Sequence, residues 1–121
     1  MQIFSKTDRG RVRTDNQDAY FAGKITDDSV FAVVCDGMGG ANAGNIASEL
    51  AVRHISEYVI RSYRDGMDMT DTEKTLKNAI VSANISLYDK AVNNAELAGM
   101  GTTAVAAFVK DGAAVIAHVG D

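Results

Sequence analysis

The stretch VFAVVCDGMGG, residues 30–40, decides the fold. Its first six residues are apolar and rich in branched side chains, and such a run ended by glycines predicts a buried β-strand covered on both faces. Asp36 is the first polar side chain beyond that strand. A carboxylate at the mouth of an apolar layer is costly unless a cation offsets its charge, and glycines let backbone carbonyls approach a cation closely. The stretch predicts a metal ligand at Asp36; a plain strand-ending Asp-Gly turn is the alternative when the motif is taken alone.

The glycines of this stretch do not match the known phosphate-binding loops. A dinucleotide fingerprint requires a glycine at its sixth position, and counting from Gly37 that position is Asn42. The Gly-Lys-Ser/Thr of a Walker loop occurs nowhere in the chain.

The composition predicts one domain with a hydrophobic core, since 46% of the 121 residues are hydrophobic. A net charge of −4 argues against non-specific nucleic-acid binding. No apolar run reaches the roughly 18 residues of a membrane span, and no signal peptide is recognisable. The single cysteine, Cys35, excludes a disulfide framework and is expected to be an inert packing thiol. We therefore expect a cytoplasmic protein without nucleic-acid or membrane partners.

The polar segment TDNQD, residues 14–18, lies between a predicted short strand at residues 2–6 and the residues Ala19-Tyr20-Phe21. It forms a junction between a loop and a strand, and its alternative interpretation is a solvated turn.

Two amphipathic helices are predicted next. Apolar residues at helical spacing predict the first over residues 42–64, ending before Gly66. His54 lies on its buried stripe, where a packed histidine with a satisfied ring nitrogen is expected. Thr70 and Glu73 match a capping box that starts a second helix reaching about Asn94. A short loop between them predicts an antiparallel pair laid on a sheet.

The last third returns to strands. Residues 102–109 and 113–119 are short-chained, branched and apolar, and the Asp-Gly turn between them predicts a hairpin. The second strand delivers an aspartate, Asp121, as the first stretch delivers Asp36.

Five motifs in this order resemble the metal-dependent type 2C (PPM family) protein serine/threonine phosphatases, with the bacterial branch most similar. They are Arg13, Gln17-Asp18, the DGMGG of residues 36–40, the GTTA of residues 101–104 and the VGD of residues 119–121. The resemblance implies an α+β fold, a four-layer αββα sandwich. It covers the whole chain but only half of the family's domain. Residues 1–121 would therefore be its N-terminal portion, with antiparallel strands and one helix pair, truncated after the Val-Gly-Asp motif.

The resemblance implies hydrolysis of phosphoserine and phosphothreonine on proteins by a water activated by two or three divalent cations, Mn²⁺ or Mg²⁺. Carried over by position, Asp36 would bridge two cations and Gly37 would offer its carbonyl to one of them. Asp18 would bind that cation or orient its water shell. Arg13 would hold the substrate phosphate through its planar fork of donors. Asp121 would match a ligand of a third cation.

Two departures from the family pattern bear on activity. Gln17 stands where many members have glutamate; its amide offers an oxygen without a charge, so a water-mediated contact is expected. Two further aspartates, which the family supplies from its C-terminal half, have no counterpart here. We therefore expect the chain alone to be inactive or nearly so. The full-length form is expected to be a monomer that acts on phosphorylated proteins, the substrates of a bacterial serine/threonine kinase.

Two other interpretations stay open. A truncated phosphatase could act as a non-catalytic, phosphoprotein-binding or regulatory module through Arg13. A nucleotide-binding α/β domain could use residues 37–40 as its phosphate loop, but the helix pair and the Asp-Gly hairpin disfavour the strand-helix-strand order which that fold requires.

Overall fold

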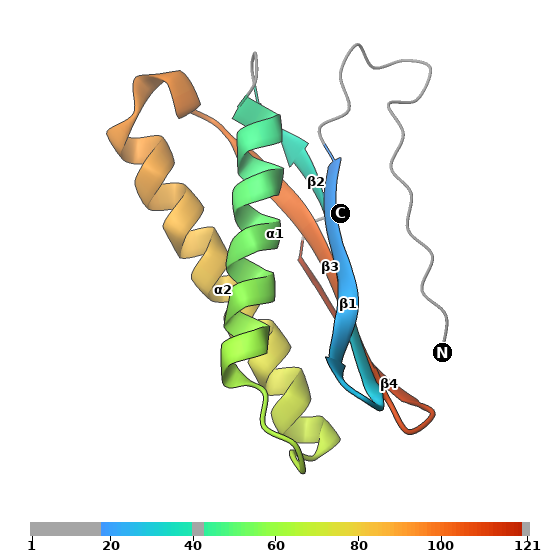
Figure 1. Cartoon of the computed structure of the whole chain (residues 1–121). Coiled ribbons are helices and arrows are strands. Elements are labelled where there is room, and N and C mark those ends of the chain that lie inside the picture. Colours follow the sequence, from blue (N-terminus) through green and yellow to red (C-terminus); the bar gives the residue numbers. More distant parts are fainter. Residues whose placement is uncertain (1–17, 40–42, 120–121) are drawn as a thin grey trace.

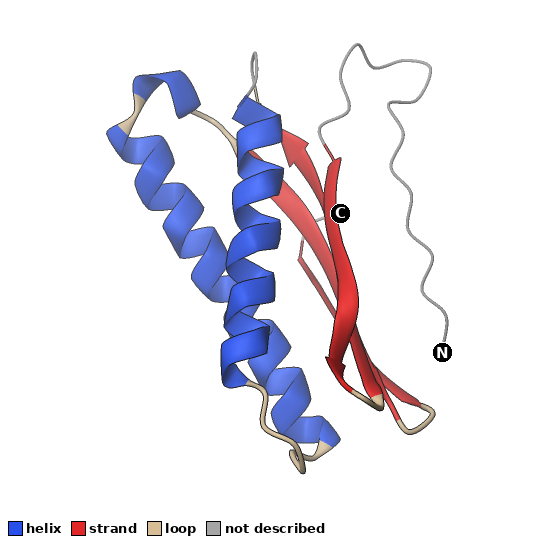
Figure 2. Ribbon diagram, in the orientation of Figure 1, coloured by secondary structure: helices blue, strands red, loops and turns tan. Residues whose placement is uncertain are grey.

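The computed structural model describes residues 18–39 and 43–119, and it places one four-stranded antiparallel sheet beneath two helices (Figure 1). The strands follow one another in the order β1-β2-β3-β4. Both helices cover the same face of the sheet, and no helix among the described residues lies on the other face (Figure 2). The elements are β1 (Asp18–Thr26), β2 (Ser29–Met38), α1 (Ala43–Ser62), α2 (Met69–Asn93), the short 3-10 helix η1 (Ala95–Leu97), β3 (Gly101–Lys110) and β4 (Ala113–Val119).

The predicted hairpin at the end of the chain is confirmed. β3 and β4 pair antiparallel from Lys110↔Ala113 to Ala104↔Val119. Asp111 and Gly112 have positive φ angles of 52° and 77°, which tight hairpin turns require and which Asp-Gly tolerates. The strand predicted for residues 2–6 lies outside the described residues.

The hydrophobic core lies between the helices and one face of the sheet. Alternate side chains of β2 point into it, and Phe31, Val33 and Cys35 are fully buried there together with Phe108 of β3. Burial with a period of two follows from the alternation of side chains along a strand.

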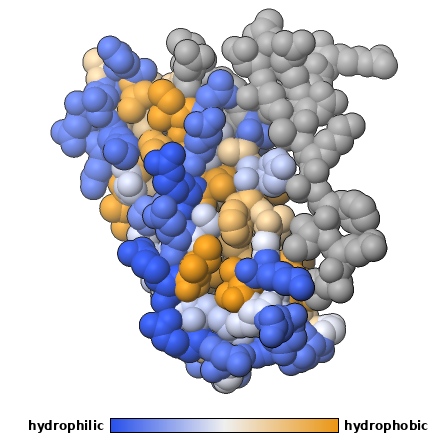
Figure 3. All heavy atoms as spheres, in the orientation of Figure 1, coloured by the Kyte–Doolittle hydropathy of each residue, from blue (hydrophilic) through white to orange (hydrophobic). Residues whose placement is uncertain are grey.

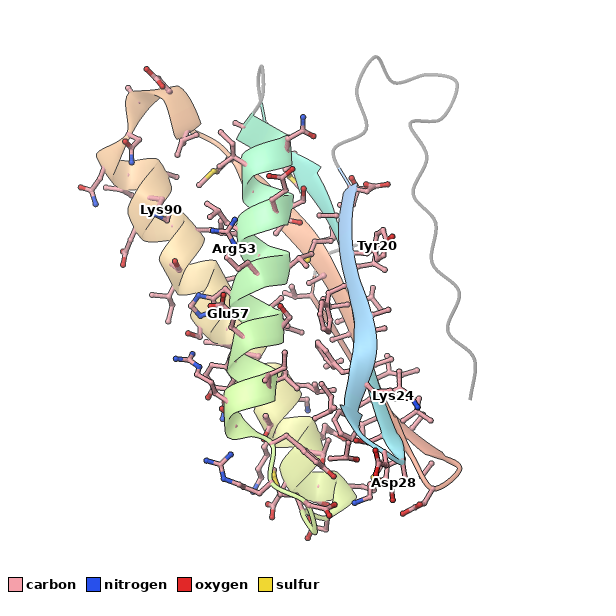
Figure 4. All side chains as sticks on the ribbon, viewed as in Figure 1. Tyr20, Lys24, Asp28, Arg53, Glu57 and Lys90 are labelled. Carbon is pink, nitrogen blue, oxygen red and sulfur yellow. The ribbon has the colours of Figure 1, made fainter. Side chains whose placement is uncertain are left out.

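The prediction that β2 is covered on both faces is wrong for the described part of the chain. Val34, between two fully buried neighbours, is 52% exposed because it points to the face without helices. Figure 4 shows Tyr20 and Lys24 projecting from β1 to the side away from α1. The apolar run thus supplies a core on one face and an exposed apolar surface on the other. The large exposed apolar side chains of that surface are Tyr20, Val34, Met38, Val105 and Ile116.

The two helices form the predicted antiparallel pair. The His54 ring nitrogen Nε2 lies 2.8 Å from the Ser82 hydroxyl of α2, which confirms the expectation of a satisfied, packed histidine. Tyr88 and Val92 of α2 are 69% and 64% exposed, so the stripe next to the buried one faces solvent. In Figure 3, hydrophilic side chains cover much of the surface of the helices, while apolar ones gather over the upper part of the helix pair and between α1 and β1. Neither helix in the described ranges has the length and apolarity needed to cross a membrane.

A hydrogen-bonded contact at the surface connects the loop between the helices to the end of β3. Lys110 Nζ donates to Asp65 Oδ1 at 2.8 Å and to the Tyr63 hydroxyl at 3.2 Å, and the Tyr63 ring lies 4.6 Å from the ring of Phe108. These hydrogen bonds raise the pKa of Lys110, and the same lysine lowers the pKa of the Asp65 carboxyl. Asp65 is exposed, so we assign this pair a role in orientation and little stability.

The predicted capping box at Thr70 and Glu73 is wrong. α2 begins at Met69, and its N-cap is Asp68, whose carboxylate oxygen Oδ1 accepts from the Asp71 amide at 2.7 Å. Asp68 has the extended backbone of an N-cap, and a carboxylate caps as well as a threonine hydroxyl. The helix therefore starts directly after Asp68, and Thr70 lies in its first turn.

Replacing Asp68 by alanine should lower the free energy of unfolding by about 1 kcal/mol, because the Asp71 amide loses its acceptor. Urea denaturation followed by circular dichroism measures this change. Thr70→Ala is the matched control and should cost less. A larger loss in Thr70→Ala than in Asp68→Ala would show that the capping box operates after all.

Candidate metal centre

Asp36 lies within β2 and not at its end. Gly37 and Met38 continue the strand and pair with Thr102 and Gly101 of β3. The expectation that the strand stops at Asp36 is therefore corrected by two residues. The ladder extends past the aspartate because β3 is long enough to pair with both Gly37 and Met38.

The strand register brings together two of the predicted metal ligands. Asp18, the first residue of β1, lies directly opposite Asp36 in the β1–β2 pair. Residues opposite each other in an antiparallel pair have Cβ atoms about 5 Å apart and share one face of the sheet. This is the face without helices, because Asp36 alternates with the core residue Cys35. Both aspartates are partly buried, and the Asp18 oxygen Oδ1 is shielded from solvent.

This pair fits a hard divalent cation. Two carboxylates placed opposite each other repel, and a cation between them removes that repulsion while using the oxygen ligands that Mg²⁺ and Mn²⁺ prefer. Gly37, whose carbonyl is the further ligand that the resemblance implies, follows Asp36 directly in the sequence. Within residues 18–39 and 43–119, no group of three or more His, Cys, Asp or Glu side chains converges, so the described part of the site holds two carboxylates.

The remaining predicted site residues, Arg13, Gln17 and Asp121, lie outside the described residues. Their roles as phosphate ligand, water-mediated contact and third-cation ligand stay predictions. Gln17 is adjacent in sequence to Asp18, and Asp121 follows β4 by two residues.

The structure gives a packing reason for the glycine at position 39, which the sequence did not indicate. Its φ angle is +149°, and a Cβ added there would lie 2.9 Å from the Ala43 Cβ at the start of α1. A side chain would therefore clash where β2 passes to the helix. This glycine sets the close approach of α1 to the sheet, independently of any role in approaching a cation.

Cys35 lies next to Asp36 in sequence but on the opposite, helix-covered face. Burial raises the pKa of its thiol from 9.0 to about 11, and a hydrogen bond with the Thr102 side chain opposes this shift. A buried thiol of this kind is a packing residue, which confirms the sequence-based expectation.

Two measurements test the buried placement of the Cys35 thiol. At pH 8 the folded protein should not react with a thiol-specific chromogenic reagent, whereas the denatured protein should react fully. Between pH 9 and about 11 the folded protein keeps a proton that the unfolded chain has lost, so stability should fall as pH rises through this range. Urea midpoints at pH 8 and pH 10.5 measure the fall, which should be smaller in Cys35→Ala. Rapid modification of the folded protein at pH 8 would contradict the buried placement.

The structure shows one sheet, one helix pair and two carboxylates that face each other across β1 and β2, and comparison with known proteins gives the family of the chain. The family model described as Protein phosphatase 2C matches residues 7–121. The chain belongs to the protein phosphatase 2C family.

Relatives and solved structures agree with this assignment. The chain is 38% identical over 116 residues to the serine/threonine phosphatase stp of Listeria monocytogenes, covering 96% of this chain and 46% of the relative. It is 31% identical over 121 residues to the protein phosphatase PhpP of Streptococcus pneumoniae, covering 100% of this chain and 48% of that one. The structure of the serine/threonine phosphatase Stp1 from Staphylococcus aureus superposes with a TM-score of 0.83 at 37% identity, covering 96% of this chain and 45% of that chain.

The chain thus spans about half the length of the relatives it matches. Its sheet and helix pair correspond to part of a type 2C phosphatase domain, as the α+β expectation stated.

Proposed function

We propose that this chain is the N-terminal part of a protein phosphatase that hydrolyses phosphoserine and phosphothreonine with the help of bound divalent cations. The observation that carries the proposal is the register of β1 and β2, which sets Asp18 opposite Asp36 at one end of the uncovered sheet face. Membership of the protein phosphatase 2C family and the names of its relatives support the same activity.

In this proposal each site residue has its own role. Asp36, with Asp18 opposite, would hold a cation of the Mn²⁺ or Mg²⁺ type, and Gly37 would add a backbone carbonyl. Arg13 would bind the substrate phosphate through paired N–H donors, and Asp121 would hold an accessory cation. Two or three bound cations would supply an activated water and charge neutralisation at the phosphoryl group.

The setting of the enzyme is part of the proposal. Its substrates would be phosphorylated proteins, including those of a bacterial serine/threonine kinase, and it would act as a cytoplasmic monomer in its full-length form. The alternative, a phosphoprotein-binding module without turnover, is supported by one observation: the described residues contribute two carboxylates, fewer than a complete two-cation site needs.

The experiment that tests the proposal uses the protein expressed from its full reading frame. Release of inorganic phosphate from a phosphothreonine peptide is measured with manganese, with a chelator, and with manganese restored. We expect turnover that the chelator abolishes and manganese restores. A phosphotyrosine peptide of the same sequence is the control and should react far more slowly. Binding of the phosphothreonine peptide without any phosphate release would favour the non-catalytic module.

A further inference from the structure

Four large apolar side chains form a stripe along the outer side of α2, which lies at the margin of the helix layer, away from β1 (Figure 1). They are Val81, Ile85, Tyr88 and Val92, and each is more than half exposed. Single exposed apolar side chains are ordinary on a protein surface, but these four follow one another at spacings of four, three and four residues. That is the spacing of the a and d positions of a coiled-coil heptad. The outer stripe is therefore one continuous seam along the helix.

The surroundings of the outer stripe suit contact with another helix. The sequence has no charged residue between Lys77 and Asp89, so covering the centre of the stripe removes no charge from water. A groove of about 400 Å³ adjoins the C-terminal half of the stripe, and Tyr88, Val92 and Met100 are among its lining residues. This groove gives the side chains of a partner room beside the helix.

The outer stripe is complementary to itself when a second copy of α2 lies antiparallel to it. With a two-fold axis between residues 86 and 87, Val81 lies opposite Val92 of the second copy, and Ile85 lies opposite its Tyr88. In a two-fold dimer every such contact occurs twice, because the same surface is used by both copies. The four apolar side chains of each copy are then all covered by apolar side chains of the other.

The two ends of the outer stripe are complementary in charge under the same pairing. Lys77 lies four residues before Val81, and Glu96 lies four residues after Val92. An antiparallel arrangement brings Lys77 of each copy to the same end as Glu96 of the other, whereas a parallel arrangement would bring the two lysines together. Both side chains are exposed, and the exposed ion pair of Lys77 with Glu73 contributes little, so Lys77 can turn to a second acidic partner.

We propose that the outer stripe of α2 is a weak two-fold interface at which a second copy of this protein binds with its α2 antiparallel. The inference goes beyond the proposed function and leaves the single chain as the catalytic unit, because Asp18 and Asp36 lie on the sheet face away from the helices. From residue 81 to residue 92 the stripe is about 16 Å long, and a helix contact of this length buries less than the roughly 1,200 Å² of a stable interface. We therefore expect a dissociation constant on the order of 100 μM, which leaves the protein monomeric at the low concentrations of an enzyme assay.

Sedimentation equilibrium of the protein expressed from its full reading frame, at concentrations below and above this constant, tests the pairing. Ile85→Glu places a charge at the centre of the outer stripe and should weaken pairing at least about tenfold, as should the second variant, Tyr88→Lys. Ile60→Glu is the matched control, since it makes the same change at an isoleucine of α1 that is 51% exposed but lies outside the stripe, and it should pair normally. Circular dichroism shows that each variant is folded. A protein that is monomeric at every concentration, or pairing that survives both stripe variants, would overturn the proposal.

The direction of pairing is tested by disulfide formation between two variants, Ile85→Cys and Tyr88→Cys, one of which carries an affinity tag. Under mild oxidation the mixture should form linked pairs of the two different variants, in excess over the linked pairs that each variant forms alone. The buried thiol of Cys35 stays out of the reaction. Linked pairs formed mainly within each variant would show a parallel contact and overturn the antiparallel arrangement. Neither measurement depends on metal or on phosphatase activity, so failure of the proposed function and failure of this inference are distinguishable.

Discussion

Replacing Asp36 by asparagine in the protein expressed from its full reading frame should lower kcat/KM for a phosphothreonine peptide about 1000-fold. The substitution keeps the shape of the side chain but removes the charge that would bridge the cations. Cation stabilisation of a phosphoryl transition state is worth several kcal/mol, and about 1.4 kcal/mol corresponds to a factor of ten, which gives this magnitude. Manganese binding, followed by calorimetry, should fall with the activity.

The stability of the same variant separates a site residue from a folding residue. The rise in melting temperature that manganese causes in the unsubstituted protein should disappear in Asp36→Asn, while the metal-free variant should still unfold cooperatively. Asp27→Asn, in the exposed turn at the far end of the same hairpin, is the matched control and should leave both activity and manganese binding unchanged. Retained manganese binding in Asp36→Asn would remove Asp36 from the site.

The 121-residue chain alone should bind manganese at least about 100-fold more weakly than the protein from the full reading frame, and should show no robust phosphatase activity. Its described residues bring two carboxylates together, and a divalent cation held by so few protein oxygens keeps most of its water and binds weakly. Calorimetry on both proteins, each with its Asp36→Asn variant, measures the difference.

This comparison needs one control that the structure suggests. Val34, Val105 and Ile116 leave an apolar surface on the open face of the sheet, which favours self-association of the short chain. Binding should therefore be measured at several protein concentrations, with the association state followed by light scattering. If the short chain already binds a pair of manganese ions tightly as a monomer, another set of carboxylates completes the site and our account of a divided site is wrong.

Local sequence patterns predicted most of the secondary structure. The hairpin at Asp111-Gly112 could be predicted because its turn needs positive φ angles that few residue pairs accept. Both helices could be predicted because their buried faces repeat at helical spacing. The start of α2 was misplaced because Asp68 and Thr70 are both good caps, and sequence alone does not say which backbone turns first.

The metal site was predictable in part. Asp36 stands out because a carboxylate after an apolar run requires an explanation, and the family motifs single out Asp18. The family motifs include the GTTA of residues 101–104, but they do not say that Thr103 lies opposite Asp36, which the β2–β3 register shows. The packing role of Gly39 was hidden for a similar reason, because its cause is the Ala43 side chain on the next element.

The sequence by itself determined the strands β2, β3 and β4, the helix pair, the inert thiol of Cys35 and the carboxylates suited to a cation, because these follow from side-chain chemistry and local periodicity. Only the tertiary structure decided that the sheet is covered on one face and that Asp18, Asp36 and Thr103 form one row across three strands. That arrangement depends on strand register, where a shift of one residue moves every side chain to the other face. The turn fixes the register within each hairpin, but the register of β2 against β3 joins segments that are distant in sequence, so no local pattern specifies it.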